Sequence, residues 1–240
     1  MKPPAPPSET SQRLLLEAAF GGDIETVKSL VEQGVNVDTS DRDHTNALMW
    51  AAHGGQTEIA SYLLRHGAWV NLKNGDQSTA LMLAVETGKL DIVTLLLDHG
   101  ANINERNRRG ESALSLAISS PLIKKDRRKM VRLLVDRGAE SWEGMLSSFN
   151  LAATVDAGDF EITAILAELG ADVNGRLFQS EETVLIYAAR KGRVEIVRVL
   201  LAHGADIHAQ MPDGGTALSV ARKHGQTQVA QLLEAADAKR

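Results

Sequence analysis

The sequence predicts an all-α fold made of repeated helix pairs, and three observations support this prediction. Hydrophobic residues make up 43% of the 240 residues, which is enough to bury a large core. Aromatic residues make up only 4%, whereas Leu and Ala, which lose little side-chain freedom in a helix, are plentiful. Glycines recur at a nearly constant spacing, which is typical of a repeat protein.

Two series of glycines mark the period. The first closes an apolar helix in each unit, at steps of 33, 33, 38, 32 and 34 residues: Gly34, Gly67, Gly100, Gly138, Gly170 and Gly204. The second lies 12 residues earlier and lacks a member only in the fourth unit: Gly22, Gly55, Gly88, Gly158, Gly192 and Gly225. The chain is therefore expected to repeat one structural unit along most of its length.

Each unit begins with a short apolar helix and a glycine turn, continues with a second helix, and closes with Gly-Ala-x-Val/Ile-Asn, as in residues 79–104. The second helix of this unit carries an apolar stripe too wide for one partner helix, so it must be sandwiched: Ile92, Val93, Leu95, Leu96 and Leu97. A carboxylate suits the positive end of that helix in five units, at Glu25, Glu58, Asp91, Glu161 and Glu195. The closing glycine supplies a left-handed cap.

This pattern resembles the ankyrin repeat over roughly residues 11–236, where seven units can be counted. The Thr-Pro-Leu-His signature of that family appears as Thr79-Ala80-Leu81-Met82, Thr183-Val184-Leu185-Ile186 and Thr216-Ala217-Leu218-Ser219, without its His. The resemblance implies helix-turn-helix units with projecting β-turn-like fingers, stacked into a solenoid with a continuous core. We expect a single repeat domain over 11–236, between a flexible Pro-rich tail at 1–10 and a polar tail at 237–240.

Charge and composition disfavour several classes of partner. The formal net charge is −5, so no global positive field draws the chain to nucleic acid or anionic lipid. No cysteine is present, which excludes disulfides, thiolate zinc sites and cysteine nucleophiles. No segment approaches the roughly 18 consecutive apolar residues that a membrane span requires, and residues 1–7 do not read as a secretory signal. We expect a cytoplasmic protein without membrane contact, although a signal removed upstream would leave no trace.

Three histidines stand directly before a closing glycine and invite comparison with a metal site: His66, His99 and His203. Equivalent residues of packed helices lie about 8–10 Å apart, whereas zinc ligands lie about 2.0–2.1 Å from one ion. We therefore interpret these side chains as partners of helix C-termini. The sequence also lacks a catalytic triad, a Walker loop and a dinucleotide fingerprint, so no catalytic residue, cofactor or metal is predicted.

The fourth unit departs from the period through an insertion near residues 119–129. We expect Ser120 to cap, and Pro121 to open, a helix that continues into Met130 and exceeds its counterparts by over a turn. Between Arg106 and Arg137, ten basic residues face three acidic ones, giving +7, so the remainder carries −12. This charge fits either a solvated helix face or a patch for an acidic protein segment. Nucleic acid is the weaker partner because no aromatic residues interleave the basic ones.

Unusual aromatic residues are the other departures. Trp69 stands near a turn, where the other units have a small or polar residue. Its side chain is either an exposed interface anchor or lies flat on the neighbouring turn. Trp50 and Tyr187 occupy an apolar slot and are predicted to be core residues. Trp142 and Met145 either cover the irregular fourth unit or form a surface patch.

The family resemblance implies a non-catalytic module, acting as adaptor, scaffold or inhibitor, that binds a protein along a concave face of finger tips and first helices. Aligned residues on that face are Arg42, Asp43, Thr45, His53, Gly75, Asp76, Ser78, Glu86, Arg108, Arg109, Glu111, Arg190, Lys191 and Lys223. The additional partner-binding candidates from the departures are Trp69, Lys124, Lys125, Arg127 and Arg128. Two alternatives remain, which are a small-ligand or enzymatic pocket at the fourth and fifth units and a nucleic-acid adaptor.

Overall fold

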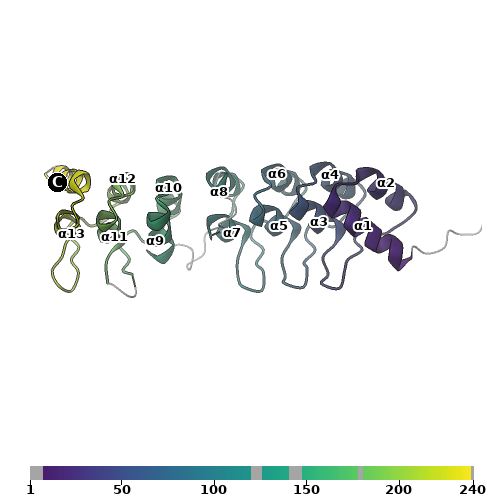
Figure 1. The fold of residues 1–240 in the computed structure, drawn as a ribbon, viewed down its shortest axis with the longest axis horizontal. Helices are drawn as coiled ribbons and strands as arrows, with labels where there is room; N and C mark the ends of the chain where they lie inside the picture. The colour runs from purple at the N-terminus through teal and green to yellow at the C-terminus, as the bar shows by residue number, and fades with distance from the viewer. Residues whose placement is uncertain (1–7, 120–125, 141–147, 178–180, 239–240) are drawn as a thin grey trace, which may run out of the picture. The chain divides into compact units, whose positions relative to one another are not determined.

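The computed structural model describes residues 8–119, 126–140, 148–177 and 181–238, which fall into two compact units (Figure 1). Unit 1 comprises Met1–Glu140 and unit 2 comprises Ser141–Arg240. The described residues are mostly helical and contain no sheet, only isolated antiparallel bridges such as Ser40 with Asn46. The all-α prediction is confirmed. No helix among the described residues is long and apolar enough to span a membrane.

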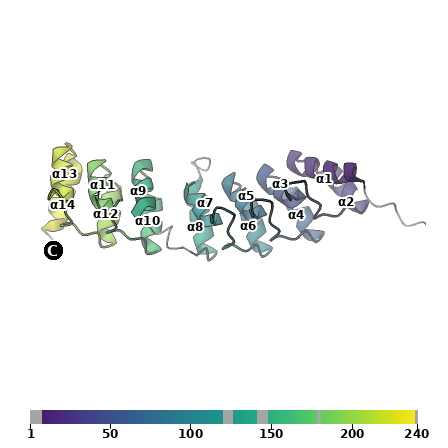
Figure 2. The same ribbon diagram turned by 90° about the horizontal axis from the view of Figure 1, so that it is seen from below.

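Unit 1 has two layers of helices, with the first helix of each pair in one layer and the second helix in the other (Figure 1). The first helices are α1 (Glu9–Gly21), α3 (Ala47–Gly54), α5 (Ala80–Glu86) and α7 (Ala113–Ser119). The second helices are α2 (Ile24–Glu32), α4 (Thr57–Arg65), α6 (Leu90–Asp98) and α8 (Arg127–Asp136). The fingers project beyond the first helices, and Figure 2 views unit 1 from that side.

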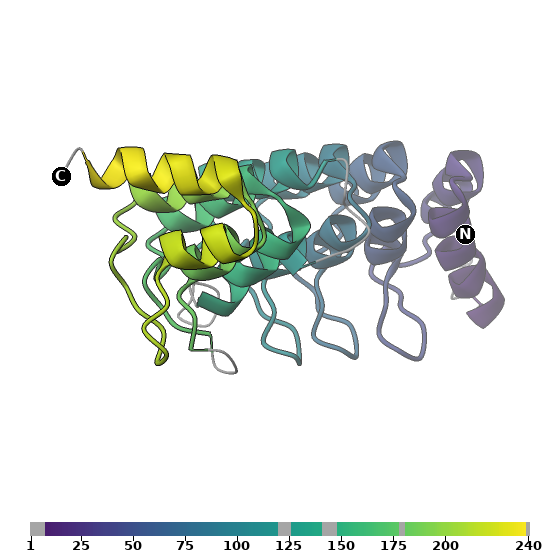
Figure 3. The same ribbon diagram turned by 60° about the vertical axis from the view of Figure 1, so that its left-hand side comes forward.

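Unit 2 repeats this arrangement with three helix pairs among its described residues. Its first helices are α9 (Ser148–Ala157), α11 (Val184–Arg190) and α13 (Ala217–Lys223). Its second helices are α10 (Phe160–Glu168), α12 (Val194–Ala202) and α14 (Thr227–Asp237). The chain segment before α13 descends as a finger below the first helices (Figure 3).

The helix ends follow from the residues that the period places there. Thr79, Thr183 and Thr216 cap first helices by accepting a hydrogen bond from the backbone N–H three residues later. The expected carboxylates lie in the first turns of α2, α4, α6, α10 and α12. His66, His99 and His203 donate from Nδ1 to the carbonyl of the residue four positions earlier, which satisfies a helix C-terminus as predicted.

The core lies between the two layers. In α6, Ile92, Val93 and Leu96 are fully buried, whereas Leu95 and Leu97 are only half-buried. This helix packs against α5 of its own pair and α4 of the preceding pair. The predicted sandwich is therefore present, with a narrower buried stripe than the sequence suggested.

The structure corrects three expectations about helix boundaries. Helix α1 begins at Glu9 and α14 ends at Asp237, so both helices extend into the segments predicted as tails. Helix α8 begins at Arg127, with Asp126 at its N-cap, because the carbonyl of Asp126 accepts the first helical hydrogen bond, from Met130. It exceeds α4 and α6 by one residue, so the prediction of an extra turn was wrong. Ser120 and Pro121 lie outside the described residues.

Trp50 and Tyr187 are half-buried, so their assignment to the core was wrong. Each reaches a carboxylate: the Trp50 Nε1 donates to Asp41, which precedes α3, at 3.1 Å, and the Tyr187 hydroxyl donates to Asp156 of α9 at 2.6 Å. Large aromatic side chains with a polar end satisfy that end at the edge of a core rather than inside it. Trp142 and Met145 lie outside the described residues.

Candidate functional site

Three fingers of unit 1 share one turn geometry, built on a side-chain oxygen at their second residue. They span residues 40–46, 73–79 and 106–112. The Oδ1 atoms of Asp41, Asn74 and Asn107 each accept two backbone hydrogen bonds, from the residues two and four positions later. Such Asx turns fix the backbone locally without a sheet. The fingers are therefore preformed loops.

Neighbouring finger tips are also bonded to each other. The backbone N–H of Gly75 donates to the carbonyl of Asp43 at 2.7 Å, and that of Arg108 donates to the carbonyl of Asp76 at 2.8 Å. A Cβ at residue 75 would lie 3.2 Å from the Asp43 carbonyl oxygen, a tight contact that glycine avoids. These bonds join the three fingers into one surface.

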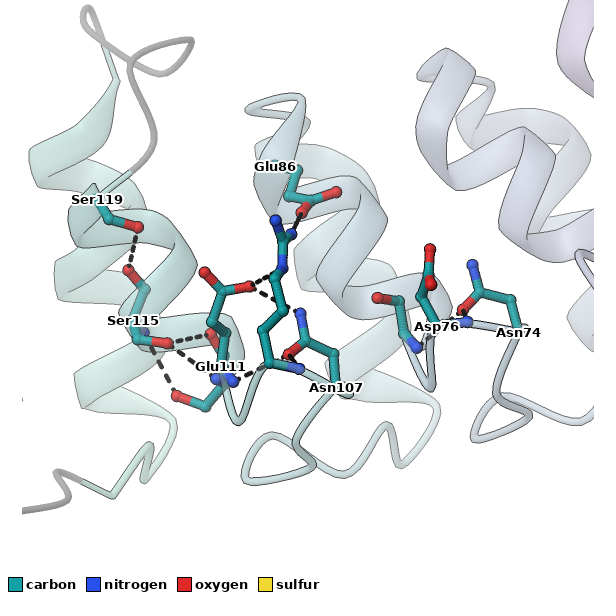
Figure 4. A network of polar contacts seen from close by, with 10 residues as sticks. Asn74, Asp76, Glu86, Asn107, Glu111, Ser115 and Ser119 are labelled. Atoms are coloured by element: carbon teal, nitrogen blue, oxygen red, sulfur yellow. Dashed lines mark hydrogen bonds and ion pairs between the residues drawn. The ribbon is translucent and has the colours of Figure 1, made fainter. Parts of the chain in front are cut away.

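A hollow of about 270 Å³ lies between the second and third fingers and α5. We call it the finger hollow, and its lining residues are Asn74, Asp76, Ser78, Leu83, Glu86, Asn107, Arg108 and Arg109. Figure 4 shows Asn74 and Asp76 on one finger, Asn107 and Glu111 on the next, and Glu86 on the helix above them. Five residues that the sequence predicted to bind a partner therefore line the finger hollow: Asp76, Ser78, Glu86, Arg108 and Arg109.

Charged groups dominate the finger hollow. The Nε of Arg109 lies 2.8 Å from a Glu111 oxygen, and its Nη2 lies 3.7 Å from a Glu86 oxygen (Figure 4). Burial raises the pKa of the Glu86 carboxyl above its ordinary value, and the carboxylates of Glu111 and Asp76 add to the rise. Arg109 and His53 oppose this rise in pKa because they stabilise the charged form. Keeping the Glu86 carboxyl charged at this site therefore costs free energy.

An aromatic cluster lies on the first helices beside the hollow, and consists of Phe20, Trp50 and His53. The Phe20 ring meets Trp50 edge-on at 5.4 Å between ring centroids and stacks on His53 at 6.1 Å. Trp50 and His53 are 6.3 Å apart, also edge-on. Phe20 remains 49% exposed. An aromatic surface is therefore presented to solvent on the same side as the fingers.

Residues of the aromatic cluster and of the finger hollow occupy equivalent positions in successive first helices. Phe20, His53 and Glu86 each follow the buried leucine of their helix by five residues, on α1, α3 and α5. Because α1 packs against α3 and α3 against α5, these residues form a row that changes from aromatic to acidic. Ser119 continues the register on α7, where its hydroxyl donates to the Ser115 carbonyl (Figure 4).

The remaining predicted residues lie apart from this row or offer little surface to a partner. Thr45 and Ser78 are buried, at 8% and 6% exposure. Trp69 is 70% exposed, which agrees with its interpretation as an exposed residue. It lies on the turn after α4, where its backbone N–H donates to Asp38. Arg127 and Arg128 begin α8 in the second-helix layer. Lys124 and Lys125 lie outside the described residues.

Most of the basic residues between Arg106 and Arg137 that the structure describes already interact within the chain. Arg137 pairs with Asp98 at 2.8 Å, Lys129 with Asp126 at 3.2 Å, and Arg106 donates to the Gly110 carbonyl. Further members that interact within the chain are Arg127, Arg128 and Arg132. Arg108 differs, because its side chain is exposed and takes part in no ion pair with the residues that the structure describes.

Unit 2 places Arg190 and Lys191 beside Tyr187, at the end of α11. The Arg190 guanidinium and the Lys191 ammonium lie 5.0 Å and 5.2 Å from the Tyr187 ring centroid. Lys191 pairs with Asp156 at 2.9 Å, and Arg190 pairs with Glu182 at 2.9 Å. The hydrogen bonds from Tyr187 and Lys191 lower the pKa of Asp156 below its ordinary value. These predicted residues form a separate charged cluster.

Unit 2 also contains a larger hollow of about 760 Å³, between α12 and α14. Its lining includes Arg198, Gln228 and Gln231, and none of the residues predicted from the sequence. It lies in the second-helix layer and lacks the bonded fingers that preform the hollow in unit 1.

Sequence reasoning missed the aromatic cluster and the residues that shape the fingers. Phe20 was detectable from its register, because it stands where His53 and Glu86 stand in later units. Asp41, Asn74 and Asn107 were detectable as residues that favour Asx turns before a helix start. The contact between Phe20 and Trp50 depends on how α1 packs against α3, and the sequence alone does not specify that packing.

Comparisons with known proteins agree with the helix-pair architecture. A family model described as ankyrin repeats (3 copies) matches residues 14–107, 70–143 and 149–239. The crystal structure of the human ASB11 ankyrin repeat domain superposes with a TM-score of 0.66 and 27% sequence identity, covering 91% of this chain and 96% of that one.

Two curated relatives match shorter segments. The B-cell lymphoma 3 protein homolog of Mus musculus is 34% identical over 91 residues, which are 38% of this chain and 20% of that protein. The putative E3 ubiquitin-protein ligase XBAT34 of Arabidopsis thaliana is 38% identical over 76 residues, which are 31% of this chain and 20% of that protein. This chain therefore matches about a fifth of the length of each relative.

Proposed function

The chain belongs to the ankyrin-repeat family, whose repeats are a general protein–protein interaction module, and we propose that it is a non-catalytic adaptor, scaffold or inhibitor. In this proposal a protein partner binds the first helices and fingers of unit 1. The observation that carries the proposal is the finger hollow, where Asp76, Glu86 and Arg108 converge on a surface preformed by hydrogen bonds between fingers.

Preformed loops favour binding because little conformational entropy is lost when a partner docks. The finger backbones are held by side-chain acceptors within each turn and by the two bonds between tips. Their exposed side chains, such as Asp76 and Arg108, differ from unit to unit. This combination of a fixed backbone and varied side chains suits one non-repetitive protein partner.

The basic charge of the third and fourth units supports a partner that binds through an acidic segment. Arg108 is the group best placed to meet it, because its side chain is exposed at a finger tip. Arg109 contributes less, since it already pairs with Glu111 and Glu86. Binding that depends on Arg108 is expected to weaken between low and physiological salt.

Affinity purification with the full chain as bait tests the proposed surface. The finger variants are Asp76→Arg and Arg108→Glu, whose side chains are exposed, and the matched control is Arg198→Glu on α12 of unit 2. We expect mass spectrometry to identify protein partners that both finger variants lose and the control retains. Partners that survive both finger substitutions, with unchanged thermal midpoints for all variants, would contradict this choice of surface.

A photo-reactive amino acid placed at residue 76 provides a second readout. Cross-links from this finger tip to the same partner are expected, whereas a probe at Gln228 on α14 should give none. Cross-links from residue 228 alone would assign binding to the other hollow.

A further inference from the structure

We propose that an extended segment of a protein partner docks beside the first finger of unit 1, residues 40–46, on the side that faces α1. This segment offers a backbone carbonyl to the N–H of Arg42 and an apolar side chain to the ring of Phe20. The inference rests on the proposed function, because it names the chemistry of the partner at one end of that surface. It depends neither on the finger hollow nor on Arg108.

The first unit has a helix where the later units have a finger. Helix α1 has 13 residues, whereas α3 has 8. When the buried Leu15 and Leu48 are aligned, residues 9–13 of α1 stand at the positions of residues 42–46 in the first finger. In Figure 1 the fingers of unit 1 stand before α3, α5 and α7. Within residues 8–119, the first finger therefore has a neighbouring finger on one side only.

The backbone N–H of Arg42 is left open by this difference. Gly75 and Arg108 hold the equivalent position in the next two fingers. Their N–H groups donate to the carbonyls of the preceding tips, at Asp43 and Asp76. Arg42 is exposed, and its N–H has no hydrogen-bond partner among the residues that the structure describes. A carbonyl of an extended partner segment would continue this series of bonds, as an added strand does at the edge of a sheet.

The repeat places Phe20 within reach of a segment bound at Arg42. Glu86 and Arg108 hold the positions of these two residues two repeats later, and both line the finger hollow. By the same geometry, Phe20 and Arg42 border the space between α1 and the first finger. Because no described finger closes this space on its other side, an extended segment can enter it.

The aromatic cluster is arranged before a partner binds. The Trp50 Nε1 donates to Asp41 of the first finger, which ties the cluster to that finger. The Phe20 ring contacts Trp50 and His53, yet about half of its surface remains open to solvent. Covering an exposed aromatic ring is favourable, and a prearranged ring loses little entropy on binding. The segment therefore presents an apolar side chain to Phe20.

A pair of substitutions at Arg42 separates the backbone N–H from the side chain. Arg42→Pro removes the N–H, and Arg42→Ala retains it while removing the side chain. Proline suits this position, because residue 42 is the second residue of a turn closed by a bond from the His44 N–H to the Asp41 carbonyl. Unchanged thermal midpoints and Trp50 fluorescence verify that both variants keep the fold. Phe20→Ser removes the aromatic contact, and Phe160→Ser is its matched control in unit 2.

Selection from a random peptide library supplies the probe. Phage-displayed dodecapeptides are panned against the full chain after depletion on Arg42→Pro, and their Kd values are measured by fluorescence anisotropy. We expect Arg42→Pro to weaken the binding of enriched peptides about three- to tenfold, the scale of one hydrogen bond. Phe20→Ser should weaken it about tenfold, whereas Arg42→Ala and Phe160→Ser should leave it unchanged.

Three results of the selection would overturn the inference. They are the absence of enriched peptides, equal losses with Arg42→Pro and Arg42→Ala, and insensitivity to Phe20→Ser. Peptides that depend on Asp76 or Arg108 instead would leave the proposed function standing. Peptides insensitive to the substitutions at Phe20, Arg42, Asp76 and Arg108 alike would contradict both.

Amide hydrogen exchange of Arg42, followed by NMR in the full chain, provides a second readout. We expect rapid exchange in the free chain and a slowing of about tenfold or more when a selected peptide is bound at saturation. Slow exchange in the free chain would show that the chain itself covers this N–H, which overturns the inference. Exchange that stays rapid in the complex would overturn it as well.

Discussion

The side-chain amide of Asn71 joins two neighbouring repeats, since its Oδ1 accepts a hydrogen bond from the backbone N–H of Asn102 at 2.8 Å. Its Nδ2 donates to the carbonyl of Gly100 at 3.1 Å. Asn174 repeats both contacts in unit 2, with Asp206 and the carbonyl of Gly204. The asparagine that ends the Gly-Ala-x-Val/Ile-Asn segment is therefore a connection to the next repeat, which explains why the period requires it.

Replacing Asn71 by alanine should destabilise unit 1. The change removes two hydrogen bonds and leaves two backbone groups of the next repeat without their partner, so we expect a loss of about 1–2 kcal/mol. Asn71→Asp retains the acceptor and should cost less, as Asp38 accepts from the Trp69 N–H at the equivalent position. Urea unfolding followed by circular dichroism measures the difference. An unfolding midpoint for Asn71→Ala equal to that of the wild type would show that the connection is dispensable.

Two glycines at equivalent ends of first helices should respond oppositely to alanine. At Gly54 the added Cβ would lie 2.8 Å from the Phe20 carbonyl oxygen, whereas at Gly21 nothing lies within 4 Å. Gly54→Ala is expected to destabilise the chain by about 1–3 kcal/mol, because backbone atoms of α1 must move. Gly21→Ala should stabilise it by up to about 1 kcal/mol through helix propensity.

Thermal unfolding of the two single variants compares them directly. Because the clash lies next to the aromatic cluster, Gly54→Ala should also change the fluorescence of Trp50. Equal effects of the two substitutions would mean that α1 adjusts freely against α3.

The sequence predicted the helices well because their signals are local and repeated. Glycine caps, first-turn carboxylates and capping threonines recur at a fixed spacing, so each copy supports the others. Burial in the first helices was harder to predict. One slot holds Leu116 and Val220, which are buried, and also Leu83, Trp50 and Tyr187, which are half-buried, so the position in the repeat does not by itself determine burial.

The start of α8 shows a second limit of sequence reasoning. Pro121 is a favourable first helical residue, yet α8 begins at Arg127, only one residue earlier relative to its closing glycine than α4 and α6 begin. The finger residues of the site were predictable from the family resemblance, whereas the aromatic cluster depends on contacts between consecutive repeats.

Replacing Glu86 by glutamine should stabilise the chain at neutral pH. The pKa of Glu86 is raised mainly by burial, so its charged form costs stability above the ordinary range of a glutamate, and protonation relieves that cost as the pH falls. Arg109 offsets part of the cost, and we expect a gain below about 1 kcal/mol. Unfolding midpoints of the two proteins should differ at pH 7 and converge below pH 4. A loss of stability at pH 7 would show that the pair with Arg109 outweighs burial.

The contact between Tyr187 and Asp156 should be visible in a spectroscopic titration. The hydrogen bond to Asp156 is the main reason why the pKa of Tyr187 lies above its ordinary value of 10.0, and Lys191 opposes it. Asp156→Asn should therefore lower the pKa of Tyr187. Ultraviolet absorbance of the tyrosinate measures this in a Tyr62→Phe background, which leaves Tyr187 as the only tyrosine.

The contact between Tyr187 and Asp156 also determines whether unit 2 gains or loses stability as the pH falls. The pKa of Asp156 is depressed by its hydrogen bonds to Tyr187 and Lys191, so the stability it contributes is present above the ordinary aspartate value of 3.8 and is lost as the pH falls through the lower folded value. Asp156 and Lys191 are both partly exposed, so this contribution is below about 1 kcal/mol. Asp156→Asn should thus unfold more easily than the wild type at pH 7, with the difference shrinking below pH 4. A difference that grows toward acid pH would mean that the carboxylate destabilises the fold.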